Sequence, residues 1–578
     1  MVTVAERPTA SASDRALCFS VPILLPLLVL VLTPGLLLQD GTIDPFIYTG
    51  YIHDYRQLWE YFGATYYGNR VAAIDLSRIT VSIAGDPYGY YLARYVLLVL
   101  MSASVMAIAR RYYGTTVAAA SAALVAFSPW YLRSIAWDYI DGFAISYLFV
   151  AFACLIAPRR HVGWWHAAAG AFFALAMNTN FFTLAVGGTF APSWILLRRG
   201  QPVGAYVKQA AALVAGFVLA YLALMVAVHL EFPNRAFFFE WATLSMINDL
   251  LINGVSQEWF QPLAVFLAKQ HYYVFVPLSV CAALAVVWFQ TRTDAVPSER
   301  RSYVTATLVY FTLMIVMYLV NHFVLHHGRI TLFYYFSYGC IPACFAVIAV
   351  IGEVTARLDS RAVRIALGSA VLLYIVAFVT VSPAWKFNPT VLTVWAVTAV
   401  ALPVSAAFRG AAWRVWPILL CIVSMPLAFY HSSEDFVALH SGEQAAVEWD
   451  VYRASIDFER EIGRIFVPQE NKIKFWYDQS LPHHGGIGAV QSIYLWGFSR
   501  VPKMPTVDAD FRKRIVNARQ LVLMGMTAEE VDRGLSALST AGIEYRLVDR
   551  KGIGGSTWSF QFAAVELPEP KTAKAPPS

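Results

Sequence analysis

The feature that most constrains this chain is a succession of apolar segments, each long enough to cross a bilayer. A membrane-spanning helix needs about 20 mostly apolar residues, because its backbone rises only ~1.5 Å per residue. Segments of this kind occupy residues 18–38, 90–110, 114–132, 141–157, 163–178, 180–198, 206–229, 272–290, 303–324, 330–352, 365–383, 389–407 and 413–430. With 58% hydrophobic and 14% charged residues, the chain has too few polar side chains to cover a soluble globule. The sequence predicts a polytopic α-helical membrane protein with about 13 transmembrane helices.

Pairs of basic residues give the expected orientation of these segments. They follow even-numbered segments, at Arg110-Arg111, Arg159-Arg160, Arg198-Arg199 and Arg300-Arg301. Cytoplasmic loops carry an excess of Lys and Arg, so we expect these loops and the N-terminal residues 1–17 in the cytoplasm. The transmembrane domain, residues 18–430, then has its outer loops at 39–89, 133–140, 231–271 and 325–329. The expected location is a plasma membrane, the inner membrane of a bacterium.

Residues 431–565 differ in character from the segments before them, with more charge and no segment of spanning length. Helical spacing is found in 443–465 and in 527–540, where Thr527 and Glu530 form a capping-box pattern. Residues 472–477, 520–524, 545–548 and 559–565 have the composition of strands. We expect a small α/β domain on the outer, periplasmic side, followed by a flexible tail at 566–578.

Charge and cysteine usage exclude two classes of function. The net charge of +6 is spread over many short loops and forms no basic tract with interleaved aromatics, so we expect no nucleic-acid partner. All six cysteines fall in apolar segments without the spacing of a zinc site, and they are expected to be buried hydrophobes.

Acidic side chains at the membrane edge are the first candidates for chemistry. A carboxylate inside a bilayer costs about 2.5–3.5 kcal/mol on insertion scales, so its presence needs a reason. Asp44 follows the first apolar segment, and Asp138 and Asp141 stand three residues apart where the fourth helix begins. That spacing allows the two side chains to share one helical face. The favourable field of a helix N-terminus, about 0.3–1 kcal/mol, is the alternative explanation for the pair.

Basic side chains on the same outer side are candidates for holding phosphate. His326, His327 and Arg329 lie in the short loop between the ninth and tenth segments, and the planar guanidinium of an arginine suits phosphate oxygens. Arg94, just inside the second segment, is a further candidate. Anchoring to lipid headgroups, with Arg94 reaching toward the interface, is the alternative for these residues.

This arrangement resembles the GT-C glycosyltransferases, polytopic enzymes that take sugars from polyprenyl-phosphate carriers on the outer face of the membrane. An acidic residue follows the first segment, Arg78 and Asp86-Pro87-Tyr88 lie further along the same loop, and an acidic motif separates the third and fourth segments. The stretch from Arg133 to Ala136, followed by Asp141-Gly142, is similar to a loop of oligosaccharyltransferase catalytic subunits, although the second acid of their pair is absent. The number of segments and the outer domain are similar to aminoarabinose transferases and protein mannosyltransferases.

The resemblance implies a role for each candidate. Asp44 would be the catalytic base, and Asp138 or Asp141 would be the second acid. Arg329, His326, His327 and Arg94 would bind the donor phosphate. Residues in contact with the acceptor or sugar would be Arg78, Tyr48, Trp476 and Asp478, the last two from a motif comparable in place to one that reads acceptors in oligosaccharyltransferases. No cofactor is certain, and a divalent metal, Mg²⁺ or Mn²⁺, is left open because only part of the metal-dependent pattern is present.

The function expected from the sequence is inverting transfer of a sugar from a polyprenyl-phosphate donor to a lipid, glycan or protein acceptor at the outer leaflet. Such chemistry needs a carboxylate to take the acceptor's proton and cations to hold the leaving phosphate. Membrane lipids are the other expected partners. The alternative from another class is a multispan transporter or lipid flippase of the cell envelope, and a third reading is a receptor or assembly scaffold. Transporters more often show repeated halves and ionisable residues at mid-bilayer depth, neither of which the sequence displays.

Overall fold

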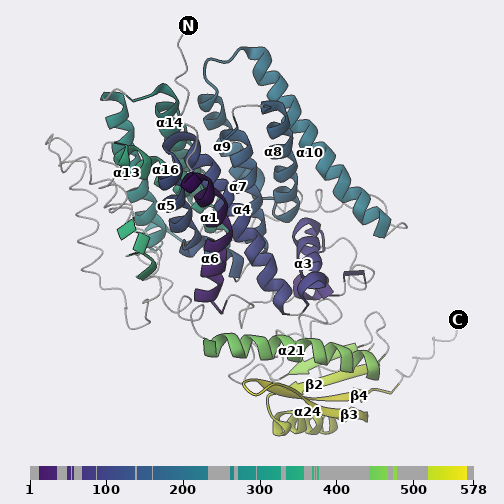
Figure 1. Ribbon diagram of the computed structural model, residues 1–578. Coiled ribbons are helices and arrows are strands. Elements are labelled where there is room, and N and C mark those ends of the chain that lie inside the picture. The colour runs from purple at the N-terminus through teal and green to yellow at the C-terminus, as the bar shows by residue number, and fades with distance from the viewer. Residues whose placement is uncertain are drawn as a thin grey trace. The chain divides into compact units, whose positions relative to one another are not determined.

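The computed structural model describes residues 12–35, 48–53, 55–56, 68–85, 87–136, 139–158, 161–231, 261–265, 271–293, 296–326, 333–356, 368–369, 371–372, 374–376, 442–466, 473–477 and 518–568. The chain divides into two compact units. The helical unit contains Met1–Pro34 and Asn69–His440, and the α/β unit contains Gly35–Gly68 and Ser441–Ser578 (Figure 1). The first expected outer loop, 39–89, is therefore divided between the two units.

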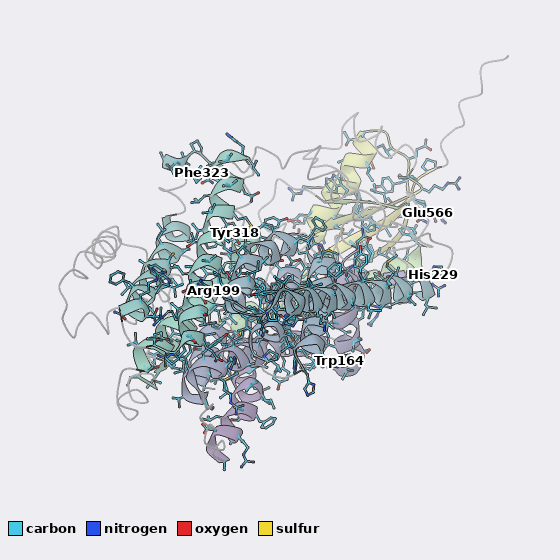
Figure 2. The ribbon with its side chains drawn as sticks, turned by 90° about the horizontal axis from the view of Figure 1, so that it is seen from above. Trp164, Arg199, His229, Tyr318, Phe323 and Glu566 are labelled. Atoms are coloured by element: carbon cyan, nitrogen blue, oxygen red, sulfur yellow. The ribbon has the colours of Figure 1, made fainter. Side chains whose placement is uncertain are left out.

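A helix lies in each expected apolar segment from 18–38 to 330–352. The helical unit contains α1 (Ala12–Leu32), α3 (Val71–Ala84), α4 (Tyr88–Tyr113), α5 (Thr115–Ala126), α6 (Pro129–Ala136), α7 (Tyr139–Ile156), α8 (Val162–Thr179), α9 (Thr183–Leu197), α10 (Val203–Glu231), α13 (His271–Thr293), α14 (Ser298–Leu319), α15 (Phe333–Ser337) and α16 (Cys340–Thr355). Helix α14 continues into a π-helix, η2 (Val320–Val324), and Tyr318 and Phe323 mark this end in Figure 2.

Length and composition identify the helices that can cross a membrane. Among the described residues, five helices are long and apolar enough, or six if the bent pair α5–α6 is one span. Most of the last three expected segments, 365–383, 389–407 and 413–430, lies outside the described residues.

The region between the third and fourth expected segments differs from the expected loop. Residues 133–140 were expected to be an outer loop, but α6 continues to Ala136 and α7 begins at Tyr139. Helices α5 and α6 are bent by 52° relative to one another. Pro129 explains the break, since proline is accepted at the first position of a helix but disrupts its interior. Helix ends thus fall within the stretch expected to be a loop, because apolar composition does not report where a helix bends.

The α/β unit contains a four-stranded sheet in the order β1 (Ile473–Tyr477), β2 (Gln520–Gly525), β4 (Ser559–Glu566) and β3 (Arg546–Gly554). Strands β1 and β2 are parallel, and the other neighbours are antiparallel. Helix α21 (Gly442–Ile465) covers one face and α24 (Ala528–Thr540) covers the other (Figure 1). The side chain of Thr527 accepts a hydrogen bond from the Glu530 N–H, which is the N-cap expected from the sequence.

Alternation along the strands builds the two cores of this sheet. Phe475, Val522 and Phe562 point toward α21, where Phe458 is buried against them. Neighbouring residues of the same strands face α24, so β1, β2 and β4 contribute to both layers, as a period of two requires. The α/β unit is therefore a three-layer sandwich with a continuous apolar contact on each side of the sheet.

An ion pair joins α14 to α16 within the helical unit. Arg300 Nε and Nη2 donate to Glu353 Oε1 and Oε2 at 2.9 and 2.8 Å, and the Glu353 side chain is fully buried. A bidentate geometry of this kind satisfies both carboxylate oxygens, which offsets much of the cost of burying the charges.

We expect Glu353→Ala to lower the stability of the protein by about 3–5 kcal/mol, because it leaves a half-buried arginine without its partner. Glu299→Ala is the matched control, since the Glu299 side chain that pairs with Arg111 is 58% exposed and its loss should cost about 0–1 kcal/mol. Thermal unfolding in detergent measures both. The double variant Arg300→Leu/Glu353→Leu should recover part of the loss, and equal instability of the single and double variants would contradict this account.

The pH dependence of the α/β unit is expected to follow Asp450 in α21. Burial disfavours its charged form, but hydrogen bonds from the Thr557 hydroxyl and from the N–H groups of Thr557 and Trp558 outweigh this and hold its pKa below the usual 3.8. A lowered pKa contributes stability that is present above the ordinary value and is lost as the pH falls through the folded-state value. Asp450→Asn should therefore speed hydrogen exchange of the β3–β4 hairpin at pH 7, with the difference from wild type shrinking under acid. The control is Asp457→Asn on the exposed face of α21, and a difference independent of pH would refute the assignment.

Candidate active site in the helical unit

Asp141 is held in the interior of the helical unit at the first turn of α7. Asp141 is only 1% exposed, whereas its position in the sequence predicted that it lies at the boundary between membrane and water. The helix N-terminus favours a carboxylate there. Gly142 permits the close approach of α6, since a Cβ at that position would lie 2.5 Å from Ile135 Cγ2 and 2.9 Å from the Ser134 carbonyl oxygen. The Asp141-Gly142 pair is thus an acid followed by the residue that lets two helices meet.

Two side chains from distant parts of the sequence donate hydrogen bonds to Asp141 Oδ1. Asn180 Nδ2 lies 2.6 Å away and the Tyr338 hydroxyl lies 2.7 Å away. The Asn180 amide is fixed in orientation because its Oδ1 accepts from the Phe182 N–H at 2.9 Å, which turns Nδ2 toward the carboxylate. Two donors on one oxygen fix the orientation of the carboxyl group.

The beginning of α3 is anchored to the same region. Asn178 Oδ1 accepts from the Ala72 N–H at 2.8 Å, its Nδ2 donates to the Asn69 carbonyl at 3.2 Å, and the Tyr147 hydroxyl donates to the Ala72 carbonyl at 3.0 Å. These bonds fix the backbone on either side of Arg70. Arg70 is buried and acts electrostatically on Tyr338, so a positive charge lies near the acid cluster.

The side chain of Asn69 places a buried hydrogen-bond acceptor in the same region. Its side-chain Oδ1 is buried and has no hydrogen-bond partner within the part of the chain that the structure describes. A buried polar atom of this kind is costly unless a water molecule or ligand satisfies it. The position beside Arg70 thus favours a polar ligand in this region.

Arg94 and Arg78, two expected binding residues, make contacts within the protein. Arg94 is buried, and its guanidinium donates to the carbonyls of Ile135 at 2.9 Å and Tyr90 at 3.2 Å, which connects α4 to the end of α6. Arg78 in α3 binds both carboxylate oxygens of Glu231 at the end of α10 and also contacts Asp75 at 3.2 Å. Burial raises the pKa of Asp75, although the charge of Arg78 opposes the effect.

Three more of the expected site residues are among the described ones. His326 is exposed and has a left-handed backbone, with φ of 54°. Tyr48 and Trp476 are buried in the α/β unit, and Trp476 packs so tightly on α24 that a Cβ at Gly534 would lie 2.7 Å from its ring. The structure gives Trp476 a packing role. Asp44, Asp138, His327, Arg329 and Asp478 lie outside the described residues, so their expected roles are still predictions.

The donor set around Asp141 does not by itself fit a divalent metal. Its Oδ1 receives an amide and a hydroxyl donor, whereas Mg²⁺ and Mn²⁺ require several oxygen ligands. No group of three or more His, Cys, Asp or Glu side chains converges among the described residues. Ligands for such an ion would have to come from other parts of the chain.

Sequence reasoning missed Asn69, Arg70, Asn178, Asn180 and Tyr338. Asn178 and Asn180 fall where two expected apolar segments almost touch, so no loop was visible there to search. Three polar residues in a row, Asn178-Thr179-Asn180, between apolar segments are the signal that could have found them. Tyr338 resembles any other aromatic residue of a membrane boundary, and only the fold brings it to Asp141.

Comparison with known proteins identifies the fold. No protein-family model matches the chain, and no match was found among curated proteins. Solved structures do match. The crystal structure of ArnT from Cupriavidus metallidurans bound to undecaprenyl phosphate aligns with a TM-score of 0.55 at 13% identity, over 98% of this chain and 100% of that one. The apo structure of the same protein aligns with a TM-score of 0.53 at 14% identity, over 96% and 98%.

A match over nearly the full length of both chains confirms the fold class expected from the sequence. It covers the helical unit and the C-terminal α/β domain alike, while the low identity limits the conclusion to the fold. The protein is an integral membrane protein with the fold of ArnT, a polytopic helical domain followed by a C-terminal α/β domain.

Proposed function

We propose that this protein is an inverting glycosyltransferase that moves a sugar from a polyprenyl-phosphate donor to an acceptor at the outer face of a bacterial inner membrane. The observation that carries the proposal is a buried, doubly hydrogen-bonded aspartate at the start of α7, in a chain with the fold of ArnT. One ArnT structure is bound to undecaprenyl phosphate, which supports a donor of that chemical class.

The reaction needs few groups. The acceptor oxygen attacks the anomeric carbon of the sugar, the bond from that carbon to the phosphate oxygen breaks, and its electron pair leaves with the polyprenyl phosphate. The acceptor's proton passes to a carboxylate, for which we propose Asp44. Cations at the phosphate stabilise the developing negative charge, and Arg329 with His326 or His327 are proposed for this role.

Asp141 is proposed as the second acid, which holds a hydroxyl or amino group of the sugar or acceptor in the reacting position. Its burial removes competing water, and the bonds from Asn180 and Tyr338 fix its orientation before a substrate arrives. Asn69 Oδ1 and Arg70 supply an acceptor and a positive charge nearby. Arg94, which donates to two backbone carbonyls, is proposed to position the α6–α7 connection instead of binding phosphate.

We expect Asp141→Asn to lower kcat/KM for sugar transfer by about 100-fold or more, because asparagine keeps the shape of the side chain and removes its charge. Tyr338→Phe should lower it by about tenfold, since one donor to the carboxylate is lost. Tyr310→Phe is the matched control, because its buried hydroxyl is found without a partner among the described residues and does not contact Asp141. Transfer from radiolabelled polyprenyl-phosphate sugars in membranes measures all three. Wild-type kinetics of a folded Asp141→Asn protein would remove Asp141 from the mechanism.

Asp44→Asn is expected to abolish transfer while donor binding is retained, because it removes the proposed proton acceptor. The same assay run with and without a chelator decides the metal question. Loss of activity that Mg²⁺ or Mn²⁺ restores would show a metal requirement. If Asp44→Asn leaves transfer intact, or if no sugar carrier is consumed and the protein instead moves labelled carrier across vesicle membranes, the transferase assignment fails in favour of transport.

A further inference from the structure

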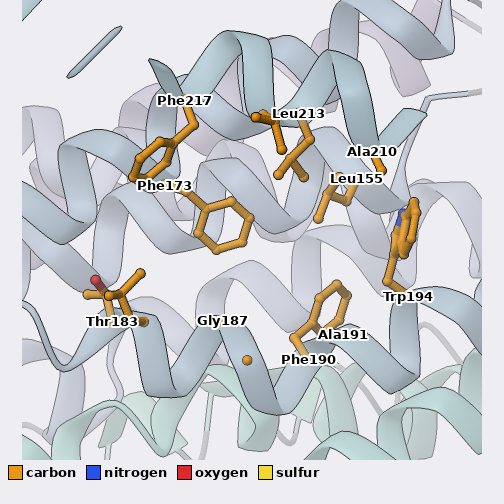
Figure 3. A pocket seen from close by; sticks show the side chains of 13 residues that line it. Leu155, Phe173, Thr183, Gly187, Phe190, Ala191, Trp194, Ala210, Leu213 and Phe217 are labelled. Atoms are coloured by element: carbon orange, nitrogen blue, oxygen red, sulfur yellow. The ribbon is translucent and has the colours of Figure 1, made fainter. Parts of the chain in front are cut away.

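The helical unit contains an apolar cavity of about 360 Å³ that the proposed reaction does not use. It lies among α7, α8, α9 and α10, and Figure 3 shows Phe173, Leu213 and Phe217 pointing into it above the face of α9. Its volume falls within the range of ligand sites, about 300–1,000 Å³. Figure 3 shows Thr183, with its hydroxyl, at one end of the cavity and Trp194 at the other.

Glycines explain why the space exists. Helices α8 and α10 meet backbone to backbone, since a Cβ at Gly170 would lie 1.9 Å from the Leu213 carbonyl oxygen and one at Gly216 would lie 1.8 Å from that of Ala167. This crossing fixes α10 against α8. Facing it, α9 presents Gly187 and Gly188, and nothing lies within 4 Å of a Cβ built at Gly188. The missing side chains leave a hollow between α9 and α10.

The cavity lies beside a helix whose apolar surface is largely exposed. Helix α10 is an apolar helix of 29 residues. Only 11% of its most apolar 18-residue stretch is buried inside the protein. Figure 2 shows this helix extending from near Arg199 to His229. Val214, which lines the cavity, is among its exposed residues. In a membrane protein such a helix faces acyl chains, so the cavity opens toward them.

One end of the cavity carries the features of a headgroup region. Trp194 Nε1 donates to His166 Nε2 at 3.2 Å, and tryptophan is enriched at membrane interfaces. Arg198 Nη2 donates to the carbonyl of Leu155, a lining residue, at 2.7 Å, and the exposed Arg199 follows. Tyr206 donates to the Arg198 carbonyl at 2.6 Å and so fixes the beginning of α10 there. Positive charge at one end of an apolar cavity is complementary to the headgroup of an anionic lipid.

We propose that this cavity binds one acyl chain of an anionic phospholipid, with its headgroup beside Arg198 and Arg199. The proposed headgroup end lies far from Asp141, because Leu155 is near the last turn of α7 and Asp141 is in the first, about 21 Å apart along the helix. The opposite end approaches the candidate active site, since the Thr183 hydroxyl donates to the carbonyl of Asn180, whose side chain donates to Asp141. The lipid fills the gap between α9 and α10 and is held by the protein, unlike the exchanging lipids around it.

Native mass spectrometry of the detergent-purified full-length protein, titrated with phosphatidylglycerol or phosphatidylcholine, tests the proposal. We expect tighter binding of phosphatidylglycerol. Gly188→Phe should weaken it more than about tenfold, since the ring takes the space of at least two methylene groups. Gly163→Phe is the matched control, because that glycine also has open space around it and does not line the cavity. Arg199→Gln should reduce the preference for phosphatidylglycerol by about fivefold.

Two further measurements keep the test decisive. Ala191→Phe fills the cavity from one helical turn further along α9 and should reproduce the loss, should Gly188→Phe fail to fold. A competition experiment with polyprenyl phosphate tests whether the cavity binds that lipid in place of phosphatidylglycerol. Unchanged phosphatidylglycerol binding in both cavity-filling variants would overturn the proposal, and so would displacement of the cavity-bound lipid by polyprenyl phosphate at lower concentration than by phosphatidylglycerol.

Discussion

The helical unit depends on how it satisfies one buried carboxylate. A carboxyl group removed from water is tolerated only when hydrogen-bond partners surround it, and Asp141 obtains them from Asn180, between α8 and α9, and from Tyr338, between α15 and α16. The hydrogen bonds of Asp141 therefore connect three regions that are far apart in sequence. Asn180 and Tyr338 cannot move independently of the fold, because each lies at a junction between two helices. A rigid polar cluster is what a group-transfer site requires, since orientation accounts for much of its effect.

Small residues decide where the helices of this unit approach one another. Gly142 allows α6 to lie against α7 and so sets the depth of the acid, while Gly170 and Gly216 bring α8 and α10 into backbone contact. Without a hydrophobic force between helices in lipid, such close packing is a main source of association. Gly187 and Gly188 act in the opposite way, because they face no close backbone and leave a cavity open. The same residue type therefore allows both the backbone contact between α8 and α10 and the cavity between α9 and α10.

The fold class could be predicted from the sequence because two patterns are strong in it, namely apolar segments of spanning length and the alternation of strands. Apolar segments of spanning length predicted helices from α1 to α16, and alternation with a Thr527 cap predicted β1, β2, β4 and α24. Helix α3 and the α5–α6 break were missed, since a short amphipathic helix and a helix that turns at Pro129 give no clear period. Asp141 was among the candidate acids because charge is rare at a membrane boundary. Its partners were not found, since amides and tyrosines are common there.

The sequence by itself determined that the chain is a polytopic membrane protein with an appended α/β domain, and it named Asp141 as one of three candidate acids with Asp44 and Asp138. These follow from local properties, because the length of an apolar run and the alternation of a strand are read from neighbouring residues. Only the tertiary structure decided that Asp141 is buried, that Asn180 and Tyr338 hold it, and that Arg94 is bound to backbone carbonyls. It also placed two glycines of α9 opposite the α8–α10 crossing. The physical reason is that hydrogen bonds and cavities depend on which helices meet, and a single sequence encodes that choice in side chains tens to hundreds of residues apart.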